Sequence, residues 1–539
     1  MPWPYNGTTS RALVTGTRAM VSSAHPQASL AGVQTLASGG NAVDAAIAVS
    51  AALDVCEPFM SGLGGGGAML IHVPGEAPTA LHYGGYFPEA ASLASLTKES
   101  IDIGPKAAVI PGAPAGWLTA HARYGCKPIR EVFAPAIARA EHGFALSRVG
   151  NGFFKAANGR VRGDAREVFF DGSDAPGIGA IIKQPRLAET YRALADGGID
   201  RFYSGDIGQA LVAAVSAAGG LMTLDDLARP QAYWATPGSS RYRDYAVVST
   251  GAPFTSYEIQ FTLNLLQQGD PGQSLEDADL WHARIEAAKL SMAERVARGG
   301  DLGDTVTGLL HPDYAEARHT LIRNDATLTA TGERYTDQRT GATIVPGSPE
   351  DYIRECTTHF DVVDESGMAV SVTQTLGSVF GSGFMAGETG IMLNNLMFFF
   401  DLDANSPMSI ELGEMRSGPL SPTMLFNQEQ LFLAIGTPGA FGIPQTTMQM
   451  VSNVVDLGYS AQAAIEAPRF RLYGGRKVGL EARVKDSVVQ ALKKRGHEVQ
   501  TIGAWSPAVG GGQGVLIDPD TGALSGGADP RRDGYSIGF

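Results

Sequence analysis

The sequence predicts an α+β protein in which mostly antiparallel sheets are layered between helices. Three observations predict this class. An alanine-rich stretch near the N-terminus has the small side chains of a deeply packed helix, two β-branched stretches meet at a short turn after Thr357, and the segment from Gly479 to Phe539 alternates strand, helix and strand. With 539 residues, the chain is long enough for one large domain or two interleaved ones.

Two helices and a strand are expected in the first part of the chain. Apolar residues recur at helical spacing between His25 and Ser38, and the glycine pair that follows ends this helix. Asn41 can cap a second, alanine-rich helix that extends to about Leu53. A run of glycines then leads into a short strand over 68–73. Further on, we expect residues 185–220 to be largely helical.

The middle of the chain changes character twice. Residues 282–297 have the periodicity of an amphipathic helix. Residues 332–352 are rich in Gly, Pro, Thr and Asp, and we expect them to be exposed and mobile. A strand over 358–363, a turn at 365–367 and a second strand over 368–376 then form a hairpin.

The remaining elements follow the hairpin. We expect strands at 390–393 and 431–435, a helix at about 443–457, and a second helix at 486–495. The change from a mobile segment to a sharp hairpin is the main boundary in the chain.

Composition excludes several classes of function. The chain carries a formal net charge of −14 and 18% charged residues, so nucleic acid and anionic membrane surfaces are not expected partners. No run of about 18 apolar residues could span a membrane. The first residues lack the apolar core of a secretory signal, which indicates the cytoplasm, or export if a signal was removed. The three cysteines form no disulfide framework.

No motif indicates a cofactor or a metal. The glycines of 62–67 match a dinucleotide fingerprint in letters, but the helix precedes them and the strand follows, which is the reverse of the required order. The ten histidines are scattered, with no pair at metal-ligand spacing. We therefore expect neither cofactor nor metal.

The strongest chemical signal stands at the start of the hairpin. Two threonines that enter a strand mean little alone, because β-branched residues belong there. Their position matters more, directly after the mobile segment and opposite a strand that ends in Thr373 and Thr375. If the bond between Cys356 and Thr357 is cut, the α-amino group of Thr357 becomes a base beside its own hydroxyl, with a reference pKa of about 8. Thr375 can orient that hydroxyl.

A glycine turn provides candidate donors for an oxyanion. Gly439 and Ala440 follow the strand expected over 431–435, and their successive N–H groups can point at one oxygen. Alone, such a turn is more often an ordinary loop.

Several short stretches over nearly the whole chain are similar to motifs of one enzyme family. In chain order, these stretches are Gly39–Ala46, Gly62–Gly66, Gly219–Leu227, Thr357–Phe360, Gly387–Asn395, Thr437–Ala440 and Ala528–Arg531. In this combination the chain resembles the gamma-glutamyltranspeptidase family of N-terminal-nucleophile hydrolases.

The resemblance implies a four-layer αββα sandwich and self-cleavage between Cys356 and Thr357. It implies a large subunit of residues 1–356 and a small subunit of residues 357–539, which form one interleaved unit that can pair into a higher oligomer. It also implies an acyl-enzyme ester on Thr357 that water or an amine resolves.

The chain departs from the family where the gamma-glutamyl head is held. The stretch that carries the family's arginine is Gly84–Pro88 here. The substrate-binding positions that the resemblance implies are Gly377 in place of an asparagine, Asn395, Phe399 in place of an acidic residue, and Gly418 with Pro419 in place of paired serines. A zwitterionic head left without charged partners costs free energy, so we expect an acyl group that lacks it. Core packing explains the phenylalanines around Phe399 almost equally well.

We therefore expect a self-processing threonine amidohydrolase that cleaves a small acyl amide. Thr357 is its nucleophile and base, Thr375 its orienting partner, and Gly439 and Ala440 its oxyanion donors. One alternative is a gamma-glutamyltransferase or glutathione hydrolase that holds its donor by other residues. Another, of a different class, is an uncut binding protein on the same fold.

Overall fold

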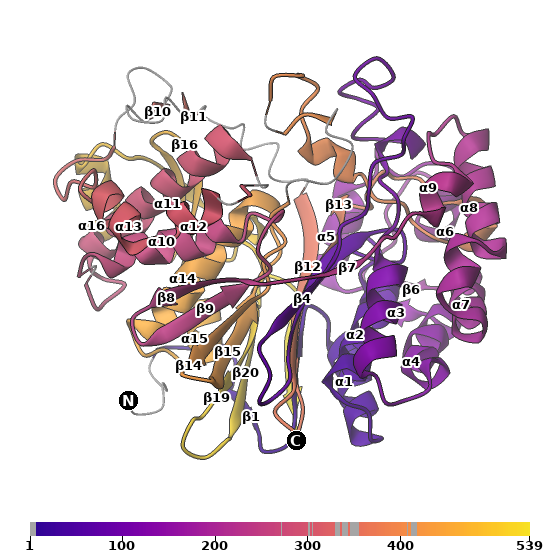
Figure 1. Cartoon of the computed structure of the whole chain (residues 1–539), viewed down its shortest axis with the longest axis horizontal. Helices are drawn as coiled ribbons and strands as arrows, with labels where there is room; N and C mark the ends of the chain where they lie inside the picture. Colours follow the sequence, from indigo (N-terminus) through magenta and orange to yellow (C-terminus); the bar gives the residue numbers. More distant parts are fainter. Residues whose placement is uncertain are drawn as a thin grey trace.

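Two seven-stranded sheets face each other at the centre of the molecule, and helices cover both outer faces (Figure 1). The computed structural model describes residues 7–270, 272–299, 302–303, 305–328, 335–336, 343–344, 355–406, 408–410 and 418–539. Every strand pair within the two large sheets is antiparallel. Four layers result, helix, sheet, sheet and helix, as the αββα prediction requires.

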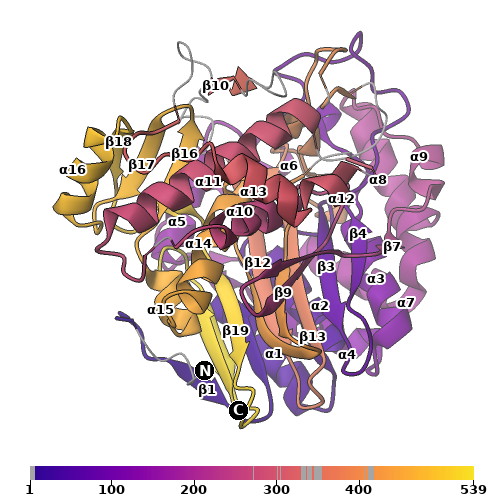
Figure 2. The ribbon, with the colours of Figure 1, turned by 60° about the vertical axis from the view of Figure 1, so that its left-hand side comes forward.

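The two sheets interleave distant parts of the sequence. One sheet has the order β1 (Val14–Gly16), β20 (Leu524–Ala528), β19 (Gln513–Ile517), β15 (Gln430–Gly436), β14 (Thr423–Asn427), β9 (Tyr245–Ser249) and β8 (Gly238–Tyr242). The other has the order β21 (Tyr535–Gly538), β2 (Met20–Ser23), β12 (Glu355–Val363), β13 (Ala369–Ser378), β3 (Gly66–His72), β4 (Thr79–Tyr83) and β7 (Tyr233–Ala235). Figure 2 shows β12 and β13 beside β3 and β4.

The helices form two outer layers. The layer that covers the β12 sheet contains α1 (Pro26–Ala37), α2 (Ala42–Cys56), α3 (Ala113–Tyr124), α4 (Ile129–His142), α5 (Arg148–Ala156), α6 (Asp164–Phe169), α7 (Pro185–Tyr203), α8 (Asp206–Ala217) and α9 (Leu224–Ala228). The layer that covers the β15 sheet contains α10 (Tyr257–Gln267), α11 (Ala278–Arg298), α12 (Thr305–Leu309), α13 (Pro312–His319), α14 (Ile443–Val455), α15 (Ala461–Glu466) and α16 (Asp486–Lys494).

Smaller elements complete the chain. A three-stranded sheet of β16 (Phe470–Gly474), β17 (Lys477–Glu481) and β18 (Glu498–Ile502) packs beside α16, and two short pairs are β5 (Phe144–Ala145) with β6 (Ile181–Ile182) and β10 (Tyr335–Thr336) with β11 (Thr343–Ile344). The 3-10 turns include η3 (Gly387–Thr389), η4 (Leu396–Phe399) and η6 (Ala440–Gly442). Turn η3 packs against α7 and α8, whereas η4 lies against β13 and η6 against β12. Among the described residues, the structure has no helix with the length and hydropathy to cross a bilayer.

Helix α2 sits at the centre of the core because its side chains are small. All of its residues are buried, and it packs against α1, α4 and the β12–β13 hairpin. The predicted cap is confirmed: the Asn41 side chain accepts the N–H groups of Val43 and Asp44, and the Asp44 carboxylate accepts the Asn41 N–H. The Asp364 carboxylate, at the hairpin turn, accepts the N–H of Ala42 at 2.8 Å. The start of α2 therefore anchors the turn of the hairpin.

Most predicted elements are confirmed, and one is wrong. Residues 185–220 are largely helical, as expected, and form the two helices α7 and α8. The strand expected over 390–393 is absent: Gly390 has a φ of +68° after η3, and the segment makes only an isolated bridge between Met385 and Met392. A glycine in the left-handed region interrupts a strand. The mobile segment expected over 332–352 lies almost wholly outside the described residues.

Candidate active site

Thr357 lies at an irregularity in the central hairpin. The pairing register of β12 and β13 shifts between Cys356 and Thr358, so Thr357 has no directly opposed partner. One residue of β12, Thr357, thus faces two residues of β13, Thr375 and Leu376. The extra residue of this bulge therefore lies on β13, and the pairing of the two strands is distorted there. Thr357 is only 2% exposed, and its backbone at this point is continuous with Cys356, which is fully buried. The structure thus places the predicted nucleophile at the distorted end of a buried strand.

Thr375 joins the nucleophile to the peptide bond that precedes it. The Thr357 hydroxyl donates to Thr375 Oγ1 at 3.2 Å, and the Thr375 hydroxyl donates to the carbonyl oxygen of Cys356. The N–H of Gly377 donates to Thr375 Oγ1 at 2.8 Å and fixes its orientation. Gly65 leaves room for this arrangement, because a Cβ there would lie 2.4 Å from the carbonyl oxygen of Thr375. A donor chain therefore runs from the Thr357 hydroxyl to the carbonyl of the preceding residue.

Two charged side chains that we did not predict flank the threonines. Glu57, the C-cap of α2, accepts the Thr358 hydroxyl at 3.1 Å, and Arg532 Nη1 donates to the Thr357 carbonyl at 3.3 Å. Burial raises the pKa of Glu57 to about 7, against the opposing effect of Arg532. Their sequence signals were weak: an acid directly after an apolar helix, and the second of two consecutive arginines near the C-terminus. Both ends of α2 thus hold the hairpin.

The glycine turn after β15 lies against β12. Gly439 has a φ of +128° and Ala440 a φ of +42°, and η6 begins at Ala440. A positive φ is unfavourable for alanine, and such strain persists only where neighbouring structure imposes it. The Thr437 hydroxyl oxygen accepts the N–H of Gly511 at 3.0 Å, and this bond ties the turn to a second glycine loop. The predicted oxyanion turn is therefore a rigid element next to the nucleophile strand.

Two of the predicted substrate-binding residues contact each other. Gly377 has a φ of +100°, and a Cβ there would lie 2.3 Å from the side-chain oxygen of Asn395. Asn395 is fully buried, accepts the N–H of Ser378 at 2.8 Å and donates to the Ser378 hydroxyl at 2.9 Å. Because Asn395 occupies the space, position 377 has no room for an asparagine side chain. In this conformation the side-chain amide of Asn395 hydrogen-bonds to Ser378 at the end of β13.

The other three predicted residues lie in two places. Phe399, at the end of η4, makes an edge-to-face contact with Phe441 of the oxyanion turn, with ring centroids 6.0 Å apart. Gly418 and Pro419 lie before β14, and their carbonyl oxygens accept bonds from Thr255 and Ser421. An aromatic pair therefore borders the turn, whereas the contacts of Gly418 and Pro419 are with neighbouring loops.

The structure also brings together histidines that are far apart in the sequence. His282 Nδ1 and His497 Nε2 lie 2.8 Å apart, and Glu286 of the same helix as His282 completes a buried group whose ligand atoms lie within 4.8 Å of one another. The Lys289 ammonium donates to Glu286 at 2.8 Å. Spacing along the chain could not reveal this grouping, because His282 and His497 are 215 residues apart.

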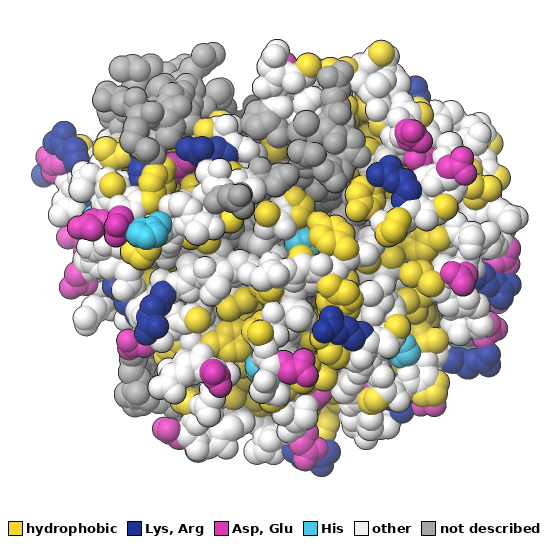
Figure 3. Space-filling view, in the orientation of Figure 1, with side chains coloured by type: hydrophobic (Ala, Val, Ile, Leu, Met, Phe, Trp, Pro, Cys, Tyr) yellow, Lys and Arg dark blue, Asp and Glu magenta, His cyan; other side chains and the backbone are white. Residues whose placement is uncertain are grey.

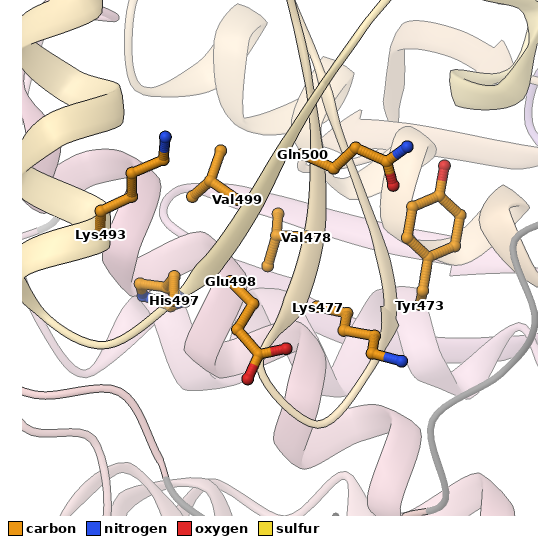
Figure 4. A pocket seen from close by; sticks show the side chains of 8 residues that line it. All are labelled: Tyr473, Lys477, Val478, Lys493, His497, Glu498, Val499 and Gln500. Carbon is orange, nitrogen blue, oxygen red and sulfur yellow. The ribbon is translucent and has the colours of Figure 1, made fainter.

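A surface pocket lies next to His497 but away from the threonines. Its volume is about 450 Å³, and Figure 4 shows its lining side chains on β16, β17, β18 and α16. These elements differ from those that carry Thr357 and the oxyanion turn. On the face seen in Figure 3, acidic and basic side chains are interspersed around the rim and hydrophobic ones gather over the middle.

Known proteins share both the sequence and the architecture of this chain. A family model described as gamma-glutamyltranspeptidase matches residues 28–539. The acylase ACY 1 proenzyme of Pseudomonas sp. (strain SE83) is 33% identical over 97% of this chain and 94% of its own length. The glutathione hydrolase proenzyme of Escherichia coli (strain K12) is 31% identical over 96% of this chain and 92% of its own. The crystal structure of a cephalosporin acylase from Bacillus halodurans, 30% identical, superimposes with a TM-score of 0.89 over 100% of this chain and 99% of its own.

Proposed function

The chain belongs to the gamma-glutamyltranspeptidase family of N-terminal-nucleophile hydrolases, and on that premise we propose that it cuts itself before Thr357 and then cleaves a small acyl amide. The observation that carries the proposal is the donor chain from the Thr357 hydroxyl through Thr375 to the Cys356 carbonyl.

Self-cleavage follows from the direction of these hydrogen bonds. Thr357 Oγ1 attacks the carbonyl carbon of Cys356 as its proton passes to Thr375, and Thr375 passes its own proton to the Cys356 oxygen. Collapse of this tetrahedral species breaks the bond between the Cys356 carbonyl carbon and the Thr357 nitrogen, which leaves as an amine with the proton returned. An ester now joins the Cys356 acyl group to Thr357 Oγ1. Water hydrolyses it to the Cys356 carboxylate and a free Thr357.

The mature residue then carries both groups that amide cleavage requires. Its α-amino group, with a reference pKa of about 8, accepts the hydroxyl proton as Oγ1 attacks the substrate carbonyl. The N–H groups of Gly439 and Ala440 stabilise the negative oxygen that forms. The substrate C–N bond breaks, the amine leaves with the proton, and water hydrolyses the acyl ester on Thr357.

The two products of self-cleavage stay together because they share both sheets. Residues 357–539 supply β12 after the cut, which pairs with β2 from residues 1–356 on one side. Strand β13 pairs with β3 of the large subunit. Separating the subunits would therefore break the central sheet.

The acyl group is inferred to lack an amino-acid head. The position where the family has an acidic residue is Phe399, which packs on Phe441 beside the oxyanion turn, and position 377 has no room for an asparagine. An aromatic wall favours apolar atoms and leaves an ammonium group without a partner. A gamma-glutamyl donor held by other residues is the second candidate, favoured by the 31% identity to a glutathione hydrolase over nearly the whole chain.

Two measurements test the proposal. Wild type and Thr357→Ala are incubated and resolved on a denaturing gel, with the expectation that wild type gives two chains and the variant one uncut chain without activity. Glutathione and the p-nitroanilides of acetyl, glutaryl, phenylacetyl and gamma-glutamyl groups are then assayed on mature enzyme. A cut, active Thr357→Ala protein would refute the nucleophile, and preferential turnover of the gamma-glutamyl substrates would refute the acyl assignment. A wild-type chain that stays whole would favour a non-catalytic protein.

A further inference from the structure

We propose that Arg471 is a positioning residue for acyl transfer: its buried guanidinium holds the Gly439–Ala440 peptide so that the Ala440 N–H faces the nucleophile. This inference rests on the proposed function. It gives Arg471, a residue of β16 outside the hairpin, the role of positioning the oxyanion donor.

The contact is direct and buried. Arg471 is 1% exposed, and its Nη1 donates to the carbonyl oxygen of Gly439 at 3.0 Å. The N–H of Gly442 donates to the same oxygen at 2.8 Å. In a planar trans peptide the C=O and the following N–H point in opposite directions. With its oxygen held by Arg471, the peptide directs the Ala440 N–H away from Arg471.

The local backbone shows how closely the guanidinium backs the turn. A Cβ on Gly442 would lie 1.2 Å from Arg471 Nη1, so only glycine fits there. Ala440 is held at a φ of +42°, in the left-handed region that is unfavourable for an alanine. The hydrogen bonds from Arg471 and from the Gly442 N–H to the Gly439 oxygen oppose a rotation of this peptide that would relieve the strain at Ala440.

Helix α14 fixes the position of Arg471 relative to the turn. Gln445 accepts the N–H of Leu472 at 2.8 Å and donates to its carbonyl at 3.3 Å. One turn later, Gln449 accepts the N–H of Phe470 at 3.0 Å and donates to its carbonyl at 3.1 Å. The two amides pair with the backbone on either side of Arg471, as a neighbouring strand would. Since α14 starts directly after η6, the turn and its clamp belong to one rigid unit.

A second guanidinium, that of Arg295, lies next to the turn. The Arg295 guanidinium lies 4.1 Å above the Phe441 ring and pairs with Glu258 at 3.1 Å. Burial raises the pKa of Glu258, and Arg295 and Arg471 oppose that rise. The hydrogen bond from Arg471 to the Gly439 carbonyl polarises the peptide that carries the Ala440 N–H. A polarised N–H binds a negative oxygen more strongly.

The two reactions of Thr357 use different donors, which makes the inference testable. In self-cleavage the developing negative oxygen belongs to Cys356 and receives its bond from Thr375. In acyl transfer it belongs to the substrate and receives its bond from the Ala440 N–H. Loss of the Arg471 clamp should therefore spare the first reaction and slow the second.

The experiment compares wild type, Arg471→Met, Arg471→Lys and the control Arg284→Met. Arg284 is another buried arginine, which donates to Ser452 of α14 at 2.8 Å, away from the turn. We expect Arg471→Met to cut itself at the wild-type rate but to lose about 10- to 100-fold in kcat, with KM within twofold, on the p-nitroanilide that wild type cleaves best. Lysine should restore at least half of the loss on a logarithmic scale, and Arg284→Met should keep wild-type kcat.

Several results would overturn the assignment. They are unchanged kcat in Arg471→Met, a rise in KM alone, an equal loss of kcat in Arg284→Met, or joint loss of self-cleavage and turnover. If Arg471→Met does not fold, Arg471→Lys decides alone: slower acylation in single turnover with normal self-cleavage supports the clamp, and wild-type acylation refutes it. A wild-type chain that never cuts itself would instead defeat the proposed function.

Discussion

Two buried polar clusters of this protein contrast in what they contain and what they do. The cluster at Thr357 has two hydroxyls and a peptide carbonyl on an irregular strand. The second, the α11 cluster, has His282, Glu286 and Lys289 on α11 and His497 in the loop between α16 and β18. Residue type alone would favour the α11 cluster as the catalytic one. We propose the Thr357 cluster as the reactive one, because its donors lead to the carbonyl of the peptide bond that we propose is cut.

The α11 cluster is a closed hydrogen-bond network. His282 Nε2 bonds the Arg323 carbonyl at 2.6 Å, Glu286 accepts the N–H of Leu328 at 2.6 Å, and Lys289 neutralises Glu286. Burial first, and then Lys289, lower the pKa of His497 to about 2. These groups satisfy one another, so the cluster stabilises the fold. The two clusters therefore differ in where their hydrogen bonds lead: to a peptide carbonyl at Thr357, and to one another in the α11 cluster.

The largest effect should come from breaking the structural cluster on α11. Lys289→Met leaves the Glu286 carboxylate buried without its cation, and we expect it to lower the free energy of unfolding by about 3–5 kcal/mol. Folded Lys289→Met should still cut itself and retain wild-type kcat. Chemical denaturation and a gel measure both. Arg476→Met is the control, because Arg476 pairs with Glu498 at the surface and its loss should cost less than about 1 kcal/mol. A folded Lys289→Met protein that fails to self-cleave would contradict the purely structural role of the α11 cluster.

The next effect tests the reactive cluster. Thr375→Ala removes the donor to the Cys356 carbonyl, and self-cleavage should slow by about 10²- to 10³-fold. Thr375→Ser should recover most of the rate. The control is Thr373→Ala. Thr373 lies on the same strand as Thr375, but its hydroxyl hydrogen-bonds to His359 Nδ1 at 2.9 Å and not to the Cys356 carbonyl. Time courses of intact mass measure the rates. Equal slowing in both alanine variants would mean that self-cleavage depends on the integrity of the strand and not on the Thr375 donor.

A third effect concerns Glu57, whose carboxyl links the C-terminal end of α2 to the hairpin. The folded pKa of Glu57, about 7, exceeds its ordinary value of 4.5. Its contribution to stability is therefore fully present below pH 4.5 and is lost as pH rises through 7. The gap in unfolding free energy between Glu57→Gln and wild type should shift in favour of the variant by about 3 kcal/mol over this range. Denaturation at several pH values measures it, and a constant gap would contradict the assignment.

The smallest effect tests backbone strain at the oxyanion turn. Ala440→Gly should raise the free energy of unfolding by up to about 1 kcal/mol, because glycine accepts a positive φ. Ala434→Gly, in the regular strand β15, should instead lower it by about 1 kcal/mol. Thermal unfolding of both variants checks the sign. Equal destabilisation of the two would show that Ala440 is not strained.

The fold could be predicted where local signals are strong. Asn41 before an alanine run indicated a capped, buried helix, and alternation around 365–367 indicated the hairpin. The failure at 390–393 has a physical cause. Apolar residues there satisfy their backbone groups through loop contacts, such as the bond from Leu393 N–H to Phe384, and not through a ladder. Short apolar runs do not distinguish these two solutions.

The site could be predicted only in part, for a similar reason. Thr357 and Thr375 lie on one hairpin, so local register brings them together. Glu57 is 301 residues from Thr358, and Arg532 is 175 residues from Thr357. Arg471 reaches Gly439 from another sheet. Contacts over such separations depend on tertiary packing, which periodicity and spacing do not encode.

The central claim is that one residue becomes both nucleophile and base by cutting the chain in front of itself. N-terminal sequencing and intact mass of folded, active wild-type protein test it most directly. We expect two chains, one of which begins Thr-Thr-His. Active protein in which Thr357 remains inside an uncut chain would contradict it.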